Sequence, residues 1–457
     1  MNPKTRKERF VVVGGCAAGM SAASKAKRLN PKLDVLVFEK TPHVSYSACG
    51  IPYFIADLVR DASELVTLTP EDFRVQRGID VCTRHEVVGI KPVQRLVTVV
   101  DLETRKEVCV GYEKLVISVG GRPSRPALPG MDLKNVFTIQ TLEDGIHIKQ
   151  FIDENHPGQV VIVGGGYIAM EMAEACCVRG LDVIILEKRA QILDGFETDI
   201  VEQVAAELKA NKVTVETSVV IERLHGNSSG KVTSVAFDDK SVQAELVLVC
   251  AGLRPSTQLA AEAGVRTGNS GAIAVDWKLQ TNVSNIYAAG DCVEVRNHVS
   301  GKPDYIPLGP TANKQGRVVG ENVGGGTAKF PGVVGTSVFK TFGLAVARTG
   351  LECERARSLG FDADVVTVDA PARAGYFSRQ QKIRVSVIFD KRSRRLLGAQ
   401  IVGPDGVSKR IDIFAAALTN RMTLNQMAYL DLSYAPPFAP VWDPVLVAVN
   451  VARGKLR

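Results

Sequence analysis

The sequence predicts an α/β fold in which two similar strand–turn–helix units precede a C-terminal α+β unit. Three observations support this prediction. An apolar, buried-type strand runs into a glycine-rich turn at residues 10–19, and the same pattern returns at residues 159–169. Each copy continues into a helix and a second strand that ends in a glutamate. From about residue 331 the pattern changes to antiparallel strands and helices without such a turn.

The composition is that of an ordinary globular chain of 457 residues, with 45% hydrophobic and 23% charged residues. This length suits two to four domains. No apolar run reaches the roughly 18 residues of a membrane span, and the run VVVGG near the start is too short for a signal peptide, so we expect a cytoplasmic protein. The net charge of +7 is scattered, which favours phosphate-bearing small molecules and gives no support to nucleic-acid binding.

The first glycine-rich turn is close to the fingerprint of a dinucleotide-binding unit. In FVVVGGCAAGMSAASKAKRL, Gly14 suits the tight turn and Gly19 suits close packing of the helix on the strand. Cys16 departs from the fingerprint, because it stands where the middle glycine belongs. The next strand ends in Glu39, which is placed to accept a hydrogen bond from a ribose hydroxyl. The sequence therefore predicts a first dinucleotide site here.

The second turn follows the fingerprint more closely. QVVIVGGGYIAMEMAEACCVRG contains Gly164, Gly166 and Ala169 at the expected positions, and the following strand ends in Glu187. This acid favours a free 2′-hydroxyl and therefore NADH over NADPH, although the neighbouring Lys188 and Arg189 leave NADPH open. Two fingerprints imply two dinucleotides, which is most simply a flavoprotein supplied by a nicotinamide.

A single cysteine lies between these two signals, in the stretch HVSYSACGIPYF. Pro52 suits the first turn of a helix, and the following residues FIADLVRD are expected to continue it. Cys49 would then lie at a helix N-terminus, where the pKa of its thiol is expected to fall. A thiolate of this kind attacks disulfides. The stretch alone also permits a small buried structural cysteine, and the flanking nucleotide signals favour the redox role.

The other cysteines and the histidines give no metal-site signal. The chain has nine cysteines without C-x-x-C spacing and six histidines without ligand pairing. We therefore expect neither a disulfide framework nor a metal site.

The middle of the chain contains an internal repeat. Residues 114–123 and 245–255 both read as a strand followed by Gly-x-Arg-Pro. Further on, Asp291 follows a strand and Gly290, and it is placed to reach a ribityl hydroxyl. A helix that begins near Thr311 would direct its free N–H groups at the carbonyl end of a reduced flavin.

The C-terminal part reads as an interface unit. The strands form an antiparallel sheet with a hairpin at residues 390–394, and residues 410–430 read as helices. The tail carries Tyr434, Phe438 and Trp442 among prolines, which makes a rigid apolar wall. Two interpretations of this wall stay open, packing against a partner subunit or contact of Tyr434 with a substrate.

Four stretches together resemble the single-cysteine branch of the flavin disulfide oxidoreductases, and they span the chain: SYSACGIPYF, IYAAGDC, PLGPTANKQGR and YAPPFAPVWDP. The resemblance is closest to the coenzyme A-disulfide reductase group, which includes NAD(P)H oxidases and persulfide reductases. It implies FAD on residues 1–120 and 255–330, NAD(P)H on residues 121–254, and a homodimer formed through residues 331–457 with active sites shared across the interface.

The resemblance also implies site residues. Cys49 would form a mixed disulfide with coenzyme A, and Tyr434 would come from the partner subunit; Tyr376 matches the first tyrosine of a pair whose second is Phe377 here. The implied coenzyme A contacts are Lys25, Arg28 and Ser45. The implied FAD residues are Gly14, Gly15, Ala17, Ala18, Gly19, Glu39, Lys40, Val81, Ser118, Gly120, Gly290, Asp291, Pro307, Gly309, Thr311 and Ala312. The implied NAD(P)H residues are Gly164, Gly166, Tyr167, Ile168, Ala169, Glu171, Glu187, Lys188 and Gly252.

Absent residues separate this chain from other branches. Cys49 has no partner at C-x-x-x-x-C spacing, residues 14–24 lack the histidine of peroxide-reducing relatives, and no rhodanese-like domain is expected. The leading hypothesis is an NAD(P)H-dependent reductase of coenzyme A disulfide or a related persulfide or polysulfide. Alternatives are an NAD(P)H oxidase, with Cys49 cycling through a sulfenic acid, and a flavin-bearing redox sensor.

Overall fold

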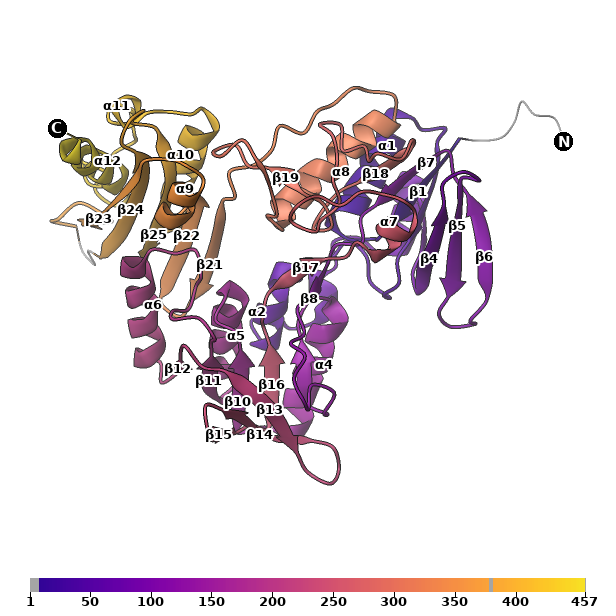
Figure 1. The fold of residues 1–457 in the computed structure, drawn as a ribbon, viewed down its shortest axis with the longest axis horizontal. Helices are drawn as coiled ribbons and strands as arrows, with labels where there is room; N and C mark the ends of the chain where they lie inside the picture. The colour runs from indigo at the N-terminus through magenta and orange to yellow at the C-terminus, as the bar shows by residue number, and fades with distance from the viewer. Residues whose placement is uncertain (1–7, 378–380, 457) are drawn as a thin grey trace.

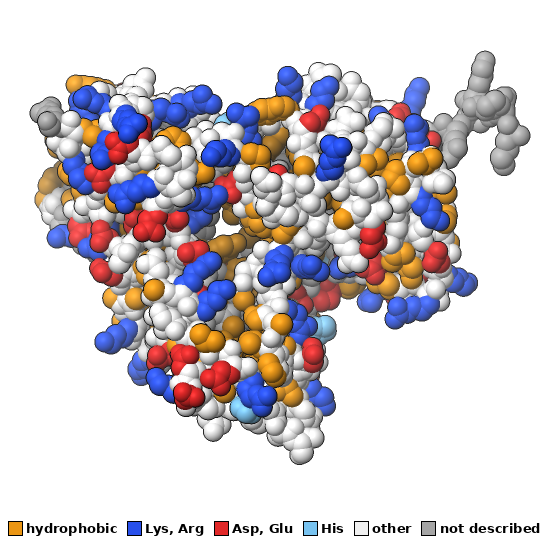
Figure 2. All heavy atoms as spheres, in the orientation of Figure 1, with side chains coloured by type: hydrophobic (Ala, Val, Ile, Leu, Met, Phe, Trp, Pro, Cys, Tyr) orange, Lys and Arg blue, Asp and Glu red, His pale blue; other side chains and the backbone are white. Residues whose placement is uncertain are grey.

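Three units make up the chain, and the computed structural model describes residues 8–377 and 381–456 of them. In Figure 1 the unit with the N-terminus lies on one side, the C-terminal unit on the other, and the third unit, in magenta, extends between and below them. Lys and Arg side chains are spread over all three units on the face shown in Figure 2. This distribution agrees with the scattered charge of the sequence.

The first unit is built on a parallel sheet of five strands in the order β18-β7-β1-β2-β3. Strand β1 is almost wholly apolar and buried, as a central parallel strand requires. Strand β18 comes from far along the chain, so a later segment completes a sheet that the first residues begin. The strands are β1 (Arg9–Val13), β2 (Asp34–Phe38), β3 (Asp80–Cys82), β7 (Lys114–Ile117) and β18 (Ile286–Ala288).

Two helices of this unit pack unusually closely. Helix α1 (Ala17–Leu29) lies against α8 (Gly309–Val323), which begins two residues before the expected Thr311. A Cβ on Gly316 would lie 2.1 Å from the carbonyl oxygen of Ala18, and one on Gly320 would lie 2.4 Å from that of Ala22. Glycine is therefore required along this contact, which holds the two helices in register.

Smaller elements surround this sheet. An antiparallel sheet is formed by β4 (His85–Lys91), β5 (Leu96–Asp101) and β6 (Glu107–Gly111), and α7 (Gln258–Glu262) packs against β4. Helix α3 (Pro70–Arg77) precedes β3, and a short ribbon pairs β19 (Val295–Arg296) with β20 (Pro303–Asp304).

The second unit repeats the architecture, with a parallel sheet in the order β12-β11-β10-β16-β9. Its strands are β9 (Val136–Thr138), β10 (Gln159–Val163), β11 (Asp182–Leu186), β12 (Thr214–Glu216) and β16 (Leu246–Val249), and its helices are α4 (Leu142–Asn155), α5 (Tyr167–Val178) and α6 (Thr198–Ala210). An antiparallel sheet of β13 (Ile221–Gly226), β14 (Val232–Phe237) and β15 (Lys240–Gln243) is attached to it.

The two Gly-x-Arg-Pro repeats meet in space. Strands β8 (Gly121–Pro123) and β17 (Leu253–Pro255) pair antiparallel, with Arg122 opposite Arg254. This ribbon is where the chain leaves the first unit and returns to it, so the repeat marks the connection between the two units.

The C-terminal unit is an antiparallel sheet in the order β21-β22-β25-β24-β23, with the predicted hairpin after Asp390. The strands are β21 (Ser337–Thr341), β22 (Leu344–Gly350), β23 (Ala363–Pro371), β24 (Lys382–Asp390) and β25 (Leu396–Gly403). The helices are α9 (Cys353–Ser358), α10 (Val407–Thr419), α11 (Leu424–Met427) and α12 (Pro444–Lys455). Phe339, Val346 and Val402 of this sheet share a buried core with the second unit.

The tail continues after its aromatic residues as helix α12. Asp443 caps it by accepting a hydrogen bond from the Val445 N–H at 2.9 Å, and Pro444 occupies its first turn. The valine-rich sequence has modest helix propensity, but burial of Val445, Ala448 and Val449 in the core of the unit stabilises the helix.

Candidate functional site

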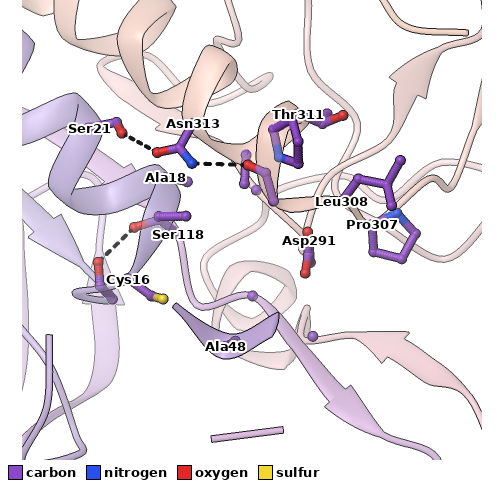
Figure 3. A pocket seen from close by; sticks show the side chains of 18 of the residues that line it. Cys16, Ala18, Ser21, Ala48, Ser118, Asp291, Pro307, Leu308, Thr311 and Asn313 are labelled. Carbon is purple, nitrogen blue, oxygen red and sulfur yellow. Dashed lines mark hydrogen bonds between the residues drawn. The ribbon is translucent and has the colours of Figure 1, made fainter. Parts of the chain in front are cut away.

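One cavity of about 2230 Å³ runs through the chain where the units meet. It is lined by the starts of α1 and α8, the end of β2, the stretch that carries Cys49, and the first turn of α5. Figure 3 shows part of its wall, with Cys16 just before α1 and Ala18 in its first turn, and with Pro307 just before α8 and Thr311 in its first turn. A cavity of this size accommodates extended ligands, and its wall draws on both dinucleotide fingerprints.

The first fingerprint forms a glycine-rich backbone wall. Gly14 has φ +103°, and a Cβ there would lie 2.3 Å from the carbonyl oxygen of Ser118. Gly19 lies behind the wall, where a Cβ would be 1.9 Å from the carbonyl oxygen of Gly14. Gly120 and Gly290, which also line the cavity, have positive φ as well. Only glycine adopts these conformations without strain, so the backbone itself is open to a ligand.

The N-termini of two helices lie at this wall. Helix α1 begins at Ala17 and α8 at Gly309, and both first turns line the cavity. The N–H groups of a first helical turn have no partner in the helix and favour anions. The Gly–Ala contact between the two helices fixes their separation. Together with the open glycine backbone, this arrangement fits a flavin dinucleotide with its pyrophosphate.

Glu39 occupies the predicted position at the end of β2 and lines the cavity. Its two carboxylate oxygens accept hydrogen bonds from the N–H groups of Gly15, at 2.7 Å, and Thr41, at 2.8 Å. These bonds orient the carboxylate, and each oxygen keeps a lone pair that can accept a ribose hydroxyl.

Asp291 also lines the cavity, directly after Gly290. Burial raises the pKa of its carboxyl group to about 6. The N–H of Gly290 donates to the side-chain oxygen of Gln315 at 2.7 Å, and the hydroxyl of Tyr305 donates to the carbonyl oxygen of Asp291 at 2.9 Å. These two bonds hold the backbone on either side of the Asp291 side chain, whose carboxyl group is suited to bind hydroxyl groups of a ligand.

Cys49 is exposed and lines the cavity, but its surroundings correct two expectations. It lies in a 3₁₀ turn (Ala48–Gly50), and helix α2 (Ile51–Ile55) has five residues instead of running on toward residue 61. The helix ends because Asp57 adopts φ +61° and Arg179 donates a hydrogen bond to the carbonyl oxygen of Ile55 at 3.0 Å.

The pKa of the Cys49 thiol is raised, contrary to the expected lowering. Partial burial is the largest cause, followed by the carboxylates of Glu171 and Asp291. A five-residue helix has a weak dipole that does not offset these effects. Burial also raises the pKa of the Cys16 thiol, which lines the same cavity, to about 11.

The second fingerprint repeats the geometry of the first. Gly164 has φ +106°, and a Cβ there would lie 2.5 Å from the carbonyl oxygen of Cys250. Glu187 is buried, and its carboxylate accepts hydrogen bonds from the N–H groups of Gly165, at 2.6 Å, and Arg189, at 2.8 Å. This pattern matches that of Glu39, so the second unit also fits a dinucleotide with a free ribose.

The first turns of α5 bring the second unit to the cavity. Tyr167, Ile168 and Glu171 line it together with Cys49. Burial and the nearby Glu174 raise the pKa of Glu171 to about 7. A nicotinamide ring between α5 and the first unit would therefore lie in the same space as Cys49.

The predicted substrate residues Lys25, Arg28 and Ser45 all line the cavity. Lys25 forms an ion pair with Glu321 on α8 at 3.2 Å. The structure adds Lys314 and Arg317 of α8 to the same lining. The sequence prediction missed these two, because only the packing of α8 on α1 brings them to the cavity that Arg28 lines. The stretch PTANKQGR was the available signal.

Tyr376 and Tyr434 lie together but outside the cavity of their own chain. Their hydroxyl groups are 3.2 Å apart, and both side chains are exposed. Phe438 and Trp442, with 77% and 63% of their surfaces exposed, lie in the same segment as Tyr434. Neither tyrosine is therefore part of the cavity wall that carries Cys49 in the same chain.

The other predicted residues divide into two sets. Those that line the cavity are Gly14, Ala17, Ala18, Glu39, Lys40, Ser118, Gly120, Gly290, Asp291, Pro307, Gly309, Thr311, Ala312, Tyr167, Ile168 and Glu171. Those outside its lining are Gly15, Gly19, Val81, Gly164, Gly166, Ala169, Glu187, Lys188 and Gly252. Several of the second set shape the turns behind the wall, and the side chain of Lys188 is exposed.

Neither a metal cluster nor a membrane span is found in the described part of the chain. Residues 8–377 and 381–456 contain no group of three or more His, Cys, Asp or Glu side chains placed to hold a metal ion. Within the same ranges, no helix is both long and apolar enough to cross a membrane.

Comparison with known families gives two matches along the chain. The model described as pyridine nucleotide-disulphide oxidoreductase matches residues 8–316, and that of the dimerisation domain of these proteins matches residues 336–444. The chain therefore belongs to the pyridine nucleotide-disulphide oxidoreductase family. This assignment confirms the predicted fold class, the oxidoreductase class, and the cofactor pair of FAD and NAD(P)H.

Individual relatives are similar over nearly the whole chain. A protein named NAD(P)H sulfur oxidoreductase (CoA-dependent) from Pyrococcus abyssi is 38% identical over 98% of both chains. A solved NAD-dependent persulfide reductase from A. fulgidus is 36% identical, with a TM-score of 0.95 over 98% of this chain and 83% of that one. The reduced Bacillus anthracis protein CoADR-RHD also has a TM-score of 0.95, at 32% identity, over 99% of this chain and 81% of that one.

Proposed function

We propose that this chain is a cytoplasmic, homodimeric reductase that passes electrons from NAD(P)H to coenzyme A disulfide or to a related persulfide or polysulfide, with Cys49 as its redox residue. The supporting observation is the position of Cys49. It is the exposed thiol in a cavity that both dinucleotide units line, and the wall of this cavity includes the cationic side chains of Lys25, Arg28, Lys314 and Arg317. A phosphate-bearing thiol compound suits this lining.

We assign FAD to the first unit, residues 1–120 and 255–330, and NAD(P)H to residues 121–254. Gly14, Glu39, Asp291 and the start of α8 would hold FAD, while Glu171, Glu187 and the start of α5 would hold the nicotinamide coenzyme. When bound, this pair supplies the two electrons that the reaction consumes.

The chain's own chemistry would centre on the sulfur atom of Cys49. Its thiolate attacks coenzyme A disulfide, which forms a Cys49–coenzyme A mixed disulfide and releases one coenzyme A thiolate. A proton on that thiolate completes the first product. Two electrons and a second proton then return the Cys49 thiolate and release the second coenzyme A thiol. The balance is NAD(P)H, one proton and one disulfide converted to NAD(P)⁺ and two thiols.

The proton donor would come from the second chain. Residues 331–457 form the proposed dimerisation unit, and Tyr376 and Tyr434 of the partner subunit would enter the cavity. The support is the hydrogen-bonded pair of exposed hydroxyls, 3.2 Å apart, beside the exposed Phe438 and Trp442. Large exposed aromatic side chains are typical of protein interfaces.

A second candidate is an NAD(P)H oxidase that uses oxygen. A relative named NADH oxidase from Methanocaldococcus jannaschii is 34% identical over 98% of this chain and 99% of its own length. Residues 14–24 contain no histidine beside the cavity, which counts against fast peroxide or oxygen chemistry at Cys49.

Anaerobic consumption of NADH with coenzyme A disulfide, compared between wild type and Cys49→Ser, tests the proposal. Turnover by the wild type should fall at least about a hundredfold in Cys49→Ser, because the nucleophile is lost. Cys109→Ser, which changes an exposed cysteine outside the cavity lining, should keep wild-type activity. Full turnover by Cys49→Ser, or turnover only with oxygen present, would contradict the proposal.

A further inference from the structure

The C-terminal unit contains a buried arginine that the proposed reaction does not use. Arg410 lies on α10 with 5% of its surface exposed, and Asp443, directly before α12, has 7% exposed. Nε of Arg410 donates to the carboxylate oxygens Oδ2 and Oδ1 of Asp443, at 3.0 and 3.3 Å. Charged side chains are almost never buried unless they are paired. The pair with Asp443 therefore permits the burial, and the other N–H groups of the guanidinium are free for further partners.

These N–H groups reach the backbone of two separate loops. One nitrogen of Arg410, Nη2, donates to the carbonyl oxygen of Ala372 at 3.0 Å and to that of Phe438 at 3.3 Å. The other, Nη1, donates to the carbonyl oxygen of Gly406 at 3.2 Å. A guanidinium is planar and directs its N–H groups in fixed directions, so Arg410 holds the two loops at a fixed separation.

The surroundings of Arg410 are shaped to hold it. Gly406 has φ +70°, and a Cβ there would lie 2.0 Å from Nη1 of Arg410. Glycine at this turn therefore leaves room for the guanidinium. On the other side, Oδ1 of Asp443 accepts the N–H of Val445 at 2.9 Å and caps α12. The ion pair thus connects α10, α12 and both loops.

The two loops that Arg410 holds carry the exposed tyrosines. Tyr376 lies four residues after Ala372, and Tyr434 lies four residues before Phe438. Each tyrosine is therefore within a short stretch of chain from a carbonyl oxygen that the same nitrogen of Arg410 binds.

The backbone, more than side-chain packing, sets where the two tyrosines lie. Tyr376 is 77% exposed and Tyr434 is 47% exposed, and their hydroxyl groups are 3.2 Å apart. The N–H of Ala374 donates to the carbonyl oxygen of Pro436 at 3.3 Å, which joins the loops at one further point. The distance between the hydroxyl groups therefore depends on these bonds between the loops.

We propose that Arg410 is a positioning residue for the tyrosine pair: it holds the two loops so that Tyr376 and Tyr434 present their hydroxyl groups together to Cys49 of the partner subunit. The inference rests on the proposed function, in which these hydroxyl groups protonate the leaving coenzyme A thiolate. Arg410 then acts on the active site of the other chain and not on that of its own.

Arg410→Lys tests the inference, because lysine keeps the charge beside Asp443 but lacks the planar group that reaches both loops. In the proposed reaction, reduction of bound FAD by NADH uses neither tyrosine, so its rate should stay within about twofold of the wild type. Anaerobic turnover of coenzyme A disulfide should fall about ten- to hundredfold, within the contribution of a general acid. Equal loss in both rates would overturn the inference, since it would show a merely structural role.

Two further variants keep this comparison clear. Arg392→Lys is the matched control, because it makes the same change at a side chain of the same unit that is 85% exposed, and both rates should match the wild type. If Arg410→Lys does not fold, Arg410→Gln/Asp443→Asn removes both charges together and leaves neither isolated in the interior. The same two rates are then expected of that double variant.

Mixed dimers separate action on the partner's site from action within one chain. A dimer of one Arg410→Lys chain and one Cys49→Ser chain has one complete site, formed by Cys49 of the first chain and the tyrosines of the second. Its turnover should be about half that of the wild type. Turnover no higher than that of the Arg410→Lys homodimer would overturn the inference, because Arg410 would then act within its own chain.

The tyrosines themselves provide the last test. In the Tyr376→Phe/Tyr434→Phe background, Arg410→Lys should have no further effect on turnover, because the groups that it positions are already absent. A further loss in that background would contradict the inference. Failure of the wild type to reduce coenzyme A disulfide would overturn the proposed function, whereas wild-type turnover that Arg410→Lys leaves unchanged would overturn this inference alone.

Discussion

The two dinucleotide units have the same turn and the same acid, but the loops after the acid differ. Gly14 and Gly164 have φ of +103° and +106°, and Glu39 and Glu187 are held by equivalent backbone N–H groups. After Glu39 the chain continues to Cys49, along the wall of the cavity. After Glu187 the chain docks on the C-terminal unit through Gln400.

This difference assigns separate tasks to units of the same fold. The shared part binds the ribose and pyrophosphate of a dinucleotide, which any such unit requires. The loop of the first unit carries the proposed redox residue, and the loop of the second is positioned by the unit that we propose forms the dimer. The chemistry therefore depends on residues outside the fingerprint.

The largest effect should come from exchanging the third fingerprint residue between the units. Gly19→Ala places a Cβ 1.9 Å from the carbonyl oxygen of Gly14, which forces α1 away from β1. We expect a loss of about 1–3 kcal/mol in the free energy of unfolding and protein that purifies without flavin absorbance.

The reverse change in the second unit is the matched control. Ala169 is fully buried and already accommodates its methyl group. Ala169→Gly should cost about 1 kcal/mol and leave the flavin content unchanged. If Gly19→Ala retained FAD as well as Ala169→Gly does, the close contact would not be what shapes the first site.

A second change tests the contact between the loop that follows β11, up to residue 197, and the C-terminal unit. Gln400→Ala removes two partly buried hydrogen bonds to the backbone of residues 195 and 197. Each such loss costs about 1–3 kcal/mol, so we expect KM for NADH and NADPH to rise together by about tenfold without loss of FAD. Gln150→Ala, which breaks only an exposed bond to Glu154, should change neither value. An unchanged KM in Gln400→Ala would show that the Gln400 side chain does not position the loop after β11.

A smaller effect is expected from a carboxylate of the second unit on the reactivity of the Cys49 thiol. The Glu171 carboxylate is one cause of the raised pKa of the Cys49 thiol, after burial. Glu171→Gln should therefore speed alkylation of Cys49 by iodoacetamide several-fold at about pH 8. The pKa of Glu171 is about 7, so the wild-type carboxyl group is neutral well below pH 7. At such pH values the alkylation rates of the wild type and of Glu171→Gln should converge.

The exposed Glu202 on α6 provides the control for that experiment. Glu202→Gln should leave the alkylation rate unchanged at every pH. A Glu171→Gln rate equal to the wild type near pH 8 would mean that the carboxylate does not act on the thiol.

The sequence predicted those features that local pattern determines. Strands β1 and β10, the turns at Gly14 and Gly164, and the C-terminal hairpin are all where the sequence pattern predicted them. Features that depend on tertiary contact were missed or wrong. Burial and distant carboxylates decide the pKa of Cys49, and packing stabilises helix α12 against its propensity. The basic side chains of α8 reach the cavity only because glycine lets that helix approach α1.

The most direct test of the central claim is the site of the covalent intermediate. Enzyme with oxidised flavin and a free Cys49 thiol, mixed anaerobically and without NADH with one equivalent of coenzyme A disulfide, should gain the mass of one coenzyme A moiety per chain, and peptide mapping should place it on Cys49. Cys49→Ser should gain none, while Cys109→Ser should label as the wild type does. An adduct on another cysteine, or disulfide reduction by the wild type with no adduct on Cys49, would contradict the account.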